Sequence, residues 1–292
     1  MFSAWPFFHP VLEAAARSET GPRPENQDNY LIIRGEGEAE YLREGRPHRL
    51  RVPRWPRRHW RLCLMDGMGG HAHGREFAAS VAEALLSEPF APRSPRRRRE
   101  RLEAIHQELH GRWHQGAESP GSTLVWIDIQ PNGLAHLAQV GDSRAFLWRE
   151  GSWQRLTQDH TPAEFQWRDG DPIEGGQPPR NVITQALGYG SFGLIRDPSG
   201  EKPAAYSERL RLDLADELPP DKQEHADLAT IQLRRGDSLL LASDGLWSGE
   251  EKEPWLQLRT EGKLHERLRE LLWGVLRKGA EDNLTAVACR LT

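Results

Sequence analysis

The chain has 292 residues and a net charge of −4, and 37% of its residues are apolar and 28% charged. This length allows one large domain or two small ones, and the composition is that of a folded protein rather than a disordered one. The weakly acidic charge gives no nucleic-acid-binding or membrane-surface signature, so we expect neither kind of partner.

The cysteines and the start of the chain bear on location. Cys63 and Cys289 each lie inside an apolar run. One possible pair in a large chain is not a disulfide framework, so we expect reduced cysteines that fill the core. Residues 1–10 lack the charged start and clean apolar stretch of a signal peptide, and no apolar run approaches the ~18 residues that span a bilayer. We therefore expect a cytoplasmic protein.

Short apolar runs bounded by Gly, Pro and Asp predict the strands. In chain order they lie at residues 30–33, 61–65, 122–129, 134–140, 145–148, 228–233, 238–242 and 284–291. Apolar residues at helical spacing predict helices at 75–86 and 100–115, after the second run, and at 264–275, before the last. Because strands and helices do not alternate regularly, a doubly wound parallel sheet is disfavoured. We predict an α+β fold of mostly antiparallel sheets with helices packed outside.

Longer stretches separate these elements, but no change in composition marks a boundary, so we predict a single domain over residues 1–292. Residues 35–60 form a polar, Arg-rich insertion, for which we expect an extended hairpin. Its basic residues form either a solvated surface or a docking patch for an acidic or phosphorylated partner. Residues 162–179 and 190–223 read as irregular loops of a length that is often functional or mobile.

Aspartates recur where apolar runs begin or end. These residues are Asp28, Asp66, Asp142, Asp244 and Asp282. A single Asp-Gly pair usually marks a turn, but a carboxylate at a buried strand end is costly unless something compensates its charge. Several such carboxylates can share a cluster of divalent cations, and Mg²⁺ and Mn²⁺ prefer oxygen ligands. Gly67, directly after Asp66, allows a tight turn whose backbone carbonyl could also face a cation.

Eight motifs that contain these residues follow one another along the chain. They are Gly21-Pro-Arg-Pro-Glu-Asn-Gln-Asp28, Met65-Asp-Gly-Met-Gly-Gly-His71, Gly121-Ser-Thr123, Val140-Gly-Asp-Ser-Arg144, Leu156-Thr-Gln-Asp-His160, Val182-Ile-Thr-Gln-Ala-Leu-Gly188, Ala242-Ser-Asp-Gly-Leu-Trp247 and Asp282-Asn-Leu-Thr285. In this order they resemble the metal-dependent type 2C (PPM-type) serine/threonine protein phosphatases, and the second motif resembles their bacterial branch. The family fold is a four-layer α-β-β-α sandwich, with two mostly antiparallel sheets flanked by helices.

The resemblance implies a metal site with two Mn²⁺ or Mg²⁺ ions per chain. Asp66 would bridge the two ions, and Gly67 would add its backbone carbonyl. Asp244 and Asp282 would complete the second ion's ligands, and Asp28 would hold the first ion, partly through water. In addition, Asp142 matches the position that holds a third, weaker ion in bacterial members, together with Asp244.

The implied activity is the hydrolysis of phosphoserine and phosphothreonine on proteins by a water that the two metals activate. Arg23 matches the arginine that binds the substrate phosphate, so the catalytic residues would be Asp66, Arg23 and Asp244. The expected partners are phosphorylated proteins, including a bacterial Ser/Thr kinase or its targets, and we expect a monomer. Two alternatives stay open: a catalytically silent pseudophosphatase that acts as a regulatory binding module, and a metallohydrolase for small phosphoesters.

Several positions depart from the family pattern. Gln27 stands where many members have Glu, and Met68 where many eukaryotic members have a His proposed as general acid. Gln185 and Ser248 replace an Arg and an acidic residue. Residues 161–180 occupy the place of the family's mobile flap, and here they are rich in Pro and Gly.

Overall fold

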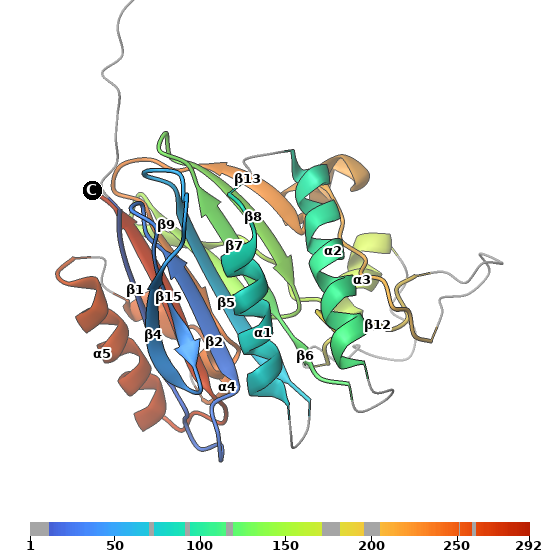
Figure 1. Cartoon of the computed structure of the whole chain (residues 1–292), viewed down its shortest axis with the longest axis horizontal. Coiled ribbons are helices and arrows are strands. Elements are labelled where there is room, and N and C mark those ends of the chain that lie inside the picture. The colour runs from blue at the N-terminus through green and yellow to red at the C-terminus, as the bar shows by residue number, and fades with distance from the viewer. Residues whose placement is uncertain are drawn as a thin grey trace, which may run out of the picture.

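The chain folds into four layers, as predicted. A computed structural model describes residues 12–69, 73–90, 94–114, 119–170, 182–195, 205–250, 252–258 and 261–292. Two β-sheets face each other between helices (Figure 1). Helices α1 (Gly74–Ser87) and α2 (Pro95–Trp113) cover the outer face of one sheet, and α5 (Leu264–Arg277) covers that of the other. The expectation for residues 1–10 lies outside the described residues.

The larger sheet has eight strands. They are β2 (Asp28–Ile33), β3 (Glu38–Arg43), β4 (Arg46–Arg51), β5 (Trp60–Met68), β6 (Gly121–Ser122), β7 (Leu124–Ile129), β8 (Leu134–Val140) and β13 (Leu228–Gln232). Their order is β13-β8-β7-β5-β2-β3-β4, with β6 paired to β5 outside this path. All of these pairings are antiparallel.

The smaller sheet has five strands. They are β1 (Leu12–Glu19), β9 (Arg144–Arg149), β10 (Ser152–Arg155), β14 (Ser238–Ala242) and β15 (Leu284–Leu291). Their order is β1-β15-β14-β9-β10, again with antiparallel pairing throughout. The predicted strands at 134–140, 238–242 and 284–291 match the observed bounds, while β1 was not predicted.

Residues 35–60 contain the expected hairpin, formed by β3 and β4. A two-residue turn joins the strands, and both Glu44 and Gly45 adopt left-handed backbone angles (φ 52° and 71°). Such turns match the natural twist of a hairpin. The insertion is therefore an integral edge of the larger sheet.

The helices differ from the prediction at two places. Helix α2 begins at Pro95, earlier than the predicted residue 100, because Pro is well suited to the first helical turn. Helix α3 (Pro162–Asp169) lies where an irregular loop was predicted. The Thr161 side chain accepts a hydrogen bond from the Glu164 N–H at its start, and Gly170 ends it in a left-handed conformation. Residues 171–180 of the flap-like segment lie outside the described residues.

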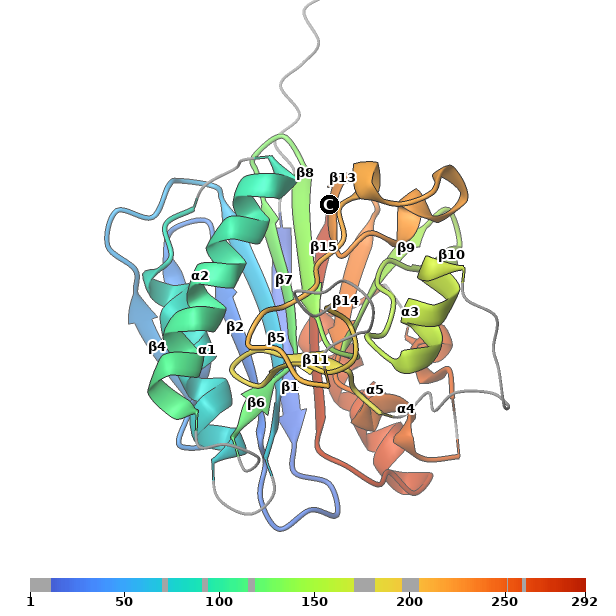
Figure 2. The same ribbon diagram turned by 90° about the vertical axis from the view of Figure 1, so that its right-hand side faces the viewer.

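Shorter elements complete the fold. They are α4 (Gly245–Ser248), the ribbon of β11 (Gln185–Ala186) and β12 (Gly190–Ser191), and the 3₁₀ turns η2 (Ala215–Glu217), η3 (Pro220–His225) and η4 (Pro254–Gln257). The β11–β12 ribbon lies between the side of α1 and α2 and that of α3 (Figure 2).

Three apolar cores hold the four layers together: one under α1 and α2, one between the sheets and one under α5. Successive side chains of a strand point to opposite faces, so β5 places Cys63 in the first core and Leu64 in the second. Cys289 lies in the core between the sheets. Both cysteines are buried and free, as predicted, and they belong to different layers.

The fold shows one further property that relates to membranes. Within the described ranges, no helix combines the length and the apolar character needed to cross a bilayer.

Candidate active site

Aspartates from both sheets meet at one end of the sandwich. Asp28 opens β2 and lies opposite Asp66 of β5 in the strand register. Asp244 follows β14, and Asp282 precedes β15 in the smaller sheet. Asp142 follows β8, and the charges of the other four aspartates all act on Asp66. The five aspartates predicted as metal ligands are therefore neighbours in space.

This crowding makes the ionised carboxylates unfavourable. Burial, followed by repulsion from Asp28 and Asp244, raises the pKa of Asp66 well above its usual value. Burial and the neighbouring aspartates also raise the pKa of Asp28 to about 7 and that of Asp142 to about 8. For Asp244, burial and repulsion by Asp282 raise the pKa to about 6. A positive charge placed among these groups would reverse all four shifts.

The donor atoms of this cluster suit hard divalent cations. Asp28 Oδ1 and Asp142 Oδ1 are buried and have no hydrogen-bond partner. A buried acceptor without a partner carries a desolvation cost, which a bound cation removes. Carboxylate oxygens are also the ligands that Mg²⁺ and Mn²⁺ prefer, so the residues present fit a pair of these ions.

The carboxylates are not yet arranged as a finished coordination shell. Among the described residues, no group of three or more His, Cys, Asp and Glu side chains already forms a metal-binding cluster. One reason is that both oxygens of Asp282 are engaged: Arg23 Nη2 lies 2.5 Å from Oδ2, and the Asn283 N–H donates to Oδ1 at 2.8 Å. Each of these oxygens accepts one hydrogen bond and keeps a further lone pair, so a cation would share the carboxylate with Arg23.

Gly67 is required by the packing of the site. A methyl group at this position would overlap the carbonyl oxygens of Gly74 and Gln27. The Gly67 N–H also donates to the Gln27 carbonyl at 3.2 Å, which joins β5 to the loop before β2. Only glycine allows the start of α1 to lie this close to Asp66.

Hydroxyl groups fix the backbone around the aspartates. Thr123 Oγ1 accepts a hydrogen bond from the Asp66 N–H at 3.0 Å and lies 2.7 Å from Ser143 Oγ. On the other sheet, Ser243 Oγ donates to Asp28 Oδ2 at 2.7 Å and accepts from the Thr285 N–H at 2.9 Å. These hydroxyls therefore bond locally and hold the backbone of Asp66 and the side chain of Asp28.

Arg23 lies at the rim of the cluster. Its side chain is 53% exposed, and its guanidinium contacts Asp282 and the carbonyl oxygen of Glu281 (3.2 Å). A planar guanidinium in this position can donate two hydrogen bonds to a phosphoryl group that approaches the aspartates.

A buried charge network next to the site was missed by the sequence analysis. The His160 side chain is fully buried, and its Nε2 lies 2.8 Å from Asp227 Oδ1. Its Nδ1 accepts from the Gly141 N–H at 3.0 Å, so the ring proton sits on Nε2. Arg168 of α3 donates to both oxygens of Asp227, at 2.8 and 2.9 Å. Burial raises the pKa of Asp227, but His160 and Arg168 outweigh it and hold that pKa below its usual range.

This network connects helix α3 to the turn that carries Asp142. His160 ends the fifth of the eight motifs, and its contact with Gly141 places it directly behind the Asp142 turn. Gln185, one of the departures from the family pattern, belongs to the same network because its Nε2 lies 2.7 Å from His160 Nδ1. One local signal pointed to Asp227, since this residue also precedes an apolar run.

The remaining departures have local roles. Gln27 Nε2 donates to Glu25 Oε1 at 2.8 Å, and Ser248 Oγ donates to the Gly245 carbonyl at 3.1 Å. Met68 closes β5 and carries no proton for a leaving group. None of these residues displaces a predicted ligand.

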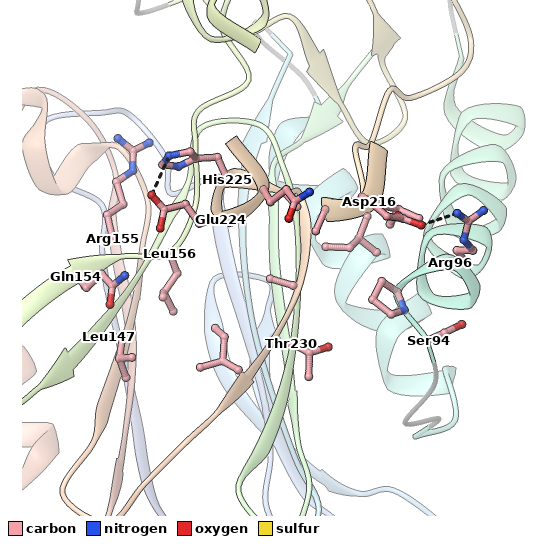
Figure 3. Close-up of a pocket in the computed structure, with 18 of the residues that line it drawn as sticks. Ser94, Arg96, Leu147, Gln154, Arg155, Leu156, Asp216, Glu224, His225 and Thr230 are labelled. Atoms are coloured by element: carbon pink, nitrogen blue, oxygen red, sulfur yellow. Dashed lines mark hydrogen bonds and ion pairs between the residues drawn. The ribbon is translucent and has the colours of Figure 1, made fainter. Parts of the chain in front are cut away.

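A cavity of about 730 Å³ lies elsewhere, between β9–β10 and β13 (Figure 3). Its floor is apolar, with Leu147 and Leu156, and its rim carries the pairs His225–Glu224 and Arg96–Asp216. None of the five aspartates lines it. The clustered aspartates therefore lie at the strand ends and not in this cavity.

The chain is similar to known protein phosphatases. The family model "Protein phosphatase 2C" matches residues 61–166. "Probable protein phosphatase 1N" of Mus musculus is 30% identical over 253 residues, which cover 82% of this chain and 59% of the mouse protein. "Serine/threonine phosphatase stp" of Listeria innocua is 25% identical over 240 residues, or 77% of this chain and 82% of that protein. The chain thus spans little more than half of the mouse relative.

A solved structure supports the fold. The catalytic domain of the serine threonine protein phosphatase PstP in complex with two manganese ions superposes with a TM-score of 0.63 at 24% identity, covering 97% of this chain and 99% of that one. The two sheets and their flanking helices form a β-sandwich that carries a carboxylate site at one end. Residues 61–166 match the protein phosphatase 2C family, and the Listeria relative that aligns over 77% of this chain is a serine/threonine phosphatase.

Proposed function

We propose that the protein hydrolyses phosphoserine and phosphothreonine on other proteins with the help of two Mn²⁺ or Mg²⁺ ions. The observation that carries this proposal is the convergence of five aspartates: four of them have raised pKa values, and Asp28 and Asp142 each have a buried oxygen without a hydrogen-bond partner, which a bound cation would compensate. The names of the Listeria relative and of the manganese-containing neighbour support the same chemistry.

Different residues of the chain would bind the metal ions and the substrate phosphate. Asp66, Asp28, Asp244, Asp282 and the backbone carbonyl of Gly67 would hold the two ions. A pair of such ions, when bound, supplies a nucleophilic water at neutral pH and neutralises charge on the phosphoryl oxygens. Asp142, with Asp244, would offer a third and weaker site.

Arg23 would orient the substrate. In the structure it is paired with Asp282, and a cation bound to this carboxylate would compete with Arg23 for its charge and weaken the pair. When Asp282 turns towards the cluster, the guanidinium becomes free to donate to the phosphoryl oxygens, which stabilises the negative charge of the transition state. Arg23 is exposed enough to make this movement without disturbing the core.

The proposed partners are phosphorylated proteins, and the enzyme would oppose a Ser/Thr kinase. The alternative of a silent regulatory module would be favoured by the loss of a metal ligand. Each of the five expected aspartates is present, and the other four lie close enough to Asp66 for their charges to raise its pKa. No observation therefore favours the alternative.

The test measures phosphate release from a phosphothreonine peptide with Mn²⁺, with a chelator, and with Asp244→Asn. Asp216→Asn is a matched control because Asp216 is 63% exposed and lies outside the cluster. We expect activity that needs metal, is lost in Asp244→Asn and is unchanged in Asp216→Asn. A folded, metal-loaded protein without activity would support the regulatory module, and a preference for nucleotides over the peptide would support a metallohydrolase of small phosphoesters.

A further inference from the structure

Strand β4 forms the free outer edge of the larger sheet (Figure 2). Along an edge strand, the backbone N–H and C=O groups of alternate residues point either to the neighbouring strand or away from the sheet. The Val52 N–H, just after β4, donates inward to the Gly37 carbonyl at 2.8 Å. Pro47, which has no N–H, falls in the outward series, as is usual for an edge proline. The backbone groups of Arg49 and Arg51 therefore point away from the sheet.

Exposed arginines surround this edge. The set, named here the arginine edge, consists of Arg43, Arg46, Arg49, Arg51, Arg54, Arg57 and Arg58. Within the described part of the chain, only Arg49 of this set has an ion pair, at 2.9 Å from Glu40. Residues 35–60 hold seven arginines against four glutamates, a net charge of +3 in a chain whose total is −4. The edge is thus a concentrated basic surface on an otherwise acidic protein.

The loop that follows β4 is held in a fixed conformation. Trp55 Nε1 donates to the His59 carbonyl, and the Arg58 N–H donates to the Gly35 carbonyl, both at 2.8 Å. Arg54 and Arg58 adopt left-handed backbone angles (φ 58° and 61°), which are unfavourable for residues other than glycine. The loop persists in this form, so its arginines are presented on an ordered backbone, which lowers the entropy cost of binding.

The arginine edge begins at the rim of the aspartate cluster. Asn29, next to Asp28, bonds through its side chain to the N–H and the carbonyl of Leu42 (2.9 and 2.8 Å). This bond places the β3–β4 turn, with Arg43 and Arg46, at the same end of the sheet as Asp28. From there β4 leads away over six residues, or about 17 Å at ~3.4 Å per residue.

We propose that the arginine edge docks an acidic, extended segment of the phosphoprotein substrate, an inference that rests on the proposed function. Carboxylates of such a segment match the unpaired guanidinium groups in charge and geometry. An extended chain can also use the outward backbone groups of Arg49 and Arg51. Because the edge starts beside the aspartates, a docked segment would lead the phosphorylated residue into the site. The outward backbone N–H and C=O groups of this edge strand favour a polypeptide over nucleic acid or an anionic membrane as the occupant.

The experiment compares phosphothreonine peptides that share one core sequence. One carries a ten-residue acidic extension, before or after the phosphorylated residue, and the other a neutral extension of equal length. The full chain with Mn²⁺ is assayed as wild type and as the triple variant Arg43→Ala/Arg46→Ala/Arg51→Ala. A matched control removes three exposed arginines on the smaller sheet's side: Arg235→Ala/Arg269→Ala/Arg277→Ala.

We expect wild type to favour the acidic peptide through a lower KM, by about tenfold if three exposed ion pairs form. The triple variant should lose this preference at unchanged kcat, whereas the control variant should keep it. All three proteins should hydrolyse the core peptide alone and p-nitrophenyl phosphate equally. Added salt should reduce the preference because the contacts are exposed.

Equal KM values for the two extended peptides in wild type, or a preference that survives in the triple variant, would overturn the proposal. Edge-dependent binding of a DNA oligonucleotide or of anionic vesicles, without a peptide preference, would assign the edge to another partner. Absence of phosphate release from every substrate would instead refute the proposed function. In that case fluorescence anisotropy of the labelled acidic peptide, on wild type and the triple variant, still decides the docking.

Discussion

Replacing Arg168 with methionine removes a buried guanidinium but keeps an unbranched side chain in its place. In the protein, Arg168 and Asp227 are both fully buried, and the guanidinium donates to both oxygens of Asp227 and to Glu164 (2.8 Å). The variant leaves the Asp227 carboxylate buried with His160 as its remaining strong partner. Removing one member of a buried ion pair costs about 3–5 kcal/mol, and a domain is stable by only about 5–15 kcal/mol.

The loss should depend on pH. Arg168 and His160 hold the pKa of Asp227 below its usual range, so this pair stabilises the fold above the unfolded-state pKa of about 4. That contribution is lost as pH falls through the folded pKa. Without Arg168 the pKa of Asp227 rises, and the carboxylate can become protonated. The deficit of the variant should therefore be largest near pH 7 and shrink towards pH 4.

Urea unfolding of wild type, Arg168→Met and Arg168→Met/Asp227→Asn at pH 7 and pH 5 measures this effect. The double variant should recover part of the loss, because it no longer buries an unpaired charge. Arg96→Met is the control: its pair with Asp216 is exposed, so its unfolding should match wild type. A loss below about 1 kcal/mol in Arg168→Met, or one that is equal at both pH values, would refute the reasoning.

Three further predictions concern the aspartate cluster. In chelator, the raised pKa values of Asp28 and Asp142, about 7 and 8, mean that the native state binds protons more tightly than the unfolded state. Their contribution to the stability of the fold is present at pH 5 and lost as pH rises to 8.5, so Tm should fall over this range. Excess Mg²⁺ should abolish the fall. A Tm in chelator that does not change with pH would contradict the account. Asp142→Asn removes one repelling carboxylate and should raise Tm of the metal-free protein at pH 8 while weakening Mn²⁺ binding; a lower Tm would count against it. Gly67→Ala should destabilise by about 1–3 kcal/mol because its methyl group overlaps two carbonyl oxygens, whereas Gly111→Ala, in open space on α2, should stabilise; calorimetric unfolding compares the two.

Strands with strong local signals were predictable, and those held by tertiary pairing were not. β8, β14 and β15 are apolar runs, buried almost throughout, that Gly, Asp or Asn residues delimit. β1 has the sequence LEAAARSE, whose Ala and Glu content favours a helix, and it is a strand because all eight residues pair with β15. Helix α3 was not predicted because its segment is rich in Pro and Gly, although Thr161 followed by Pro162 is a recognised helix start.

The aspartate cluster was predictable because its members share one local pattern, an aspartate next to the beginning or the end of an apolar run. Asp227 follows the same pattern, yet it binds His160 and Arg168 instead of joining the cluster. The residues that make this difference lie 67 and 59 positions away in the chain. Sequence spacing cannot show which carboxylate meets an arginine and which meets other carboxylates, because that choice depends on how the two sheets pack.

The central claim, that the five aspartates form a divalent-cation site, is tested most directly by titration calorimetry of Mn²⁺ into the metal-free protein. Wild type should bind at least two ions, and Asp216→Asn should bind the same number. Asp66→Asn should lose both, because Asp66 lies at the centre of the cluster, where the other four carboxylates act on it. Wild-type protein that binds no Mn²⁺, or Asp66→Asn protein that binds it as wild type does, would contradict the account.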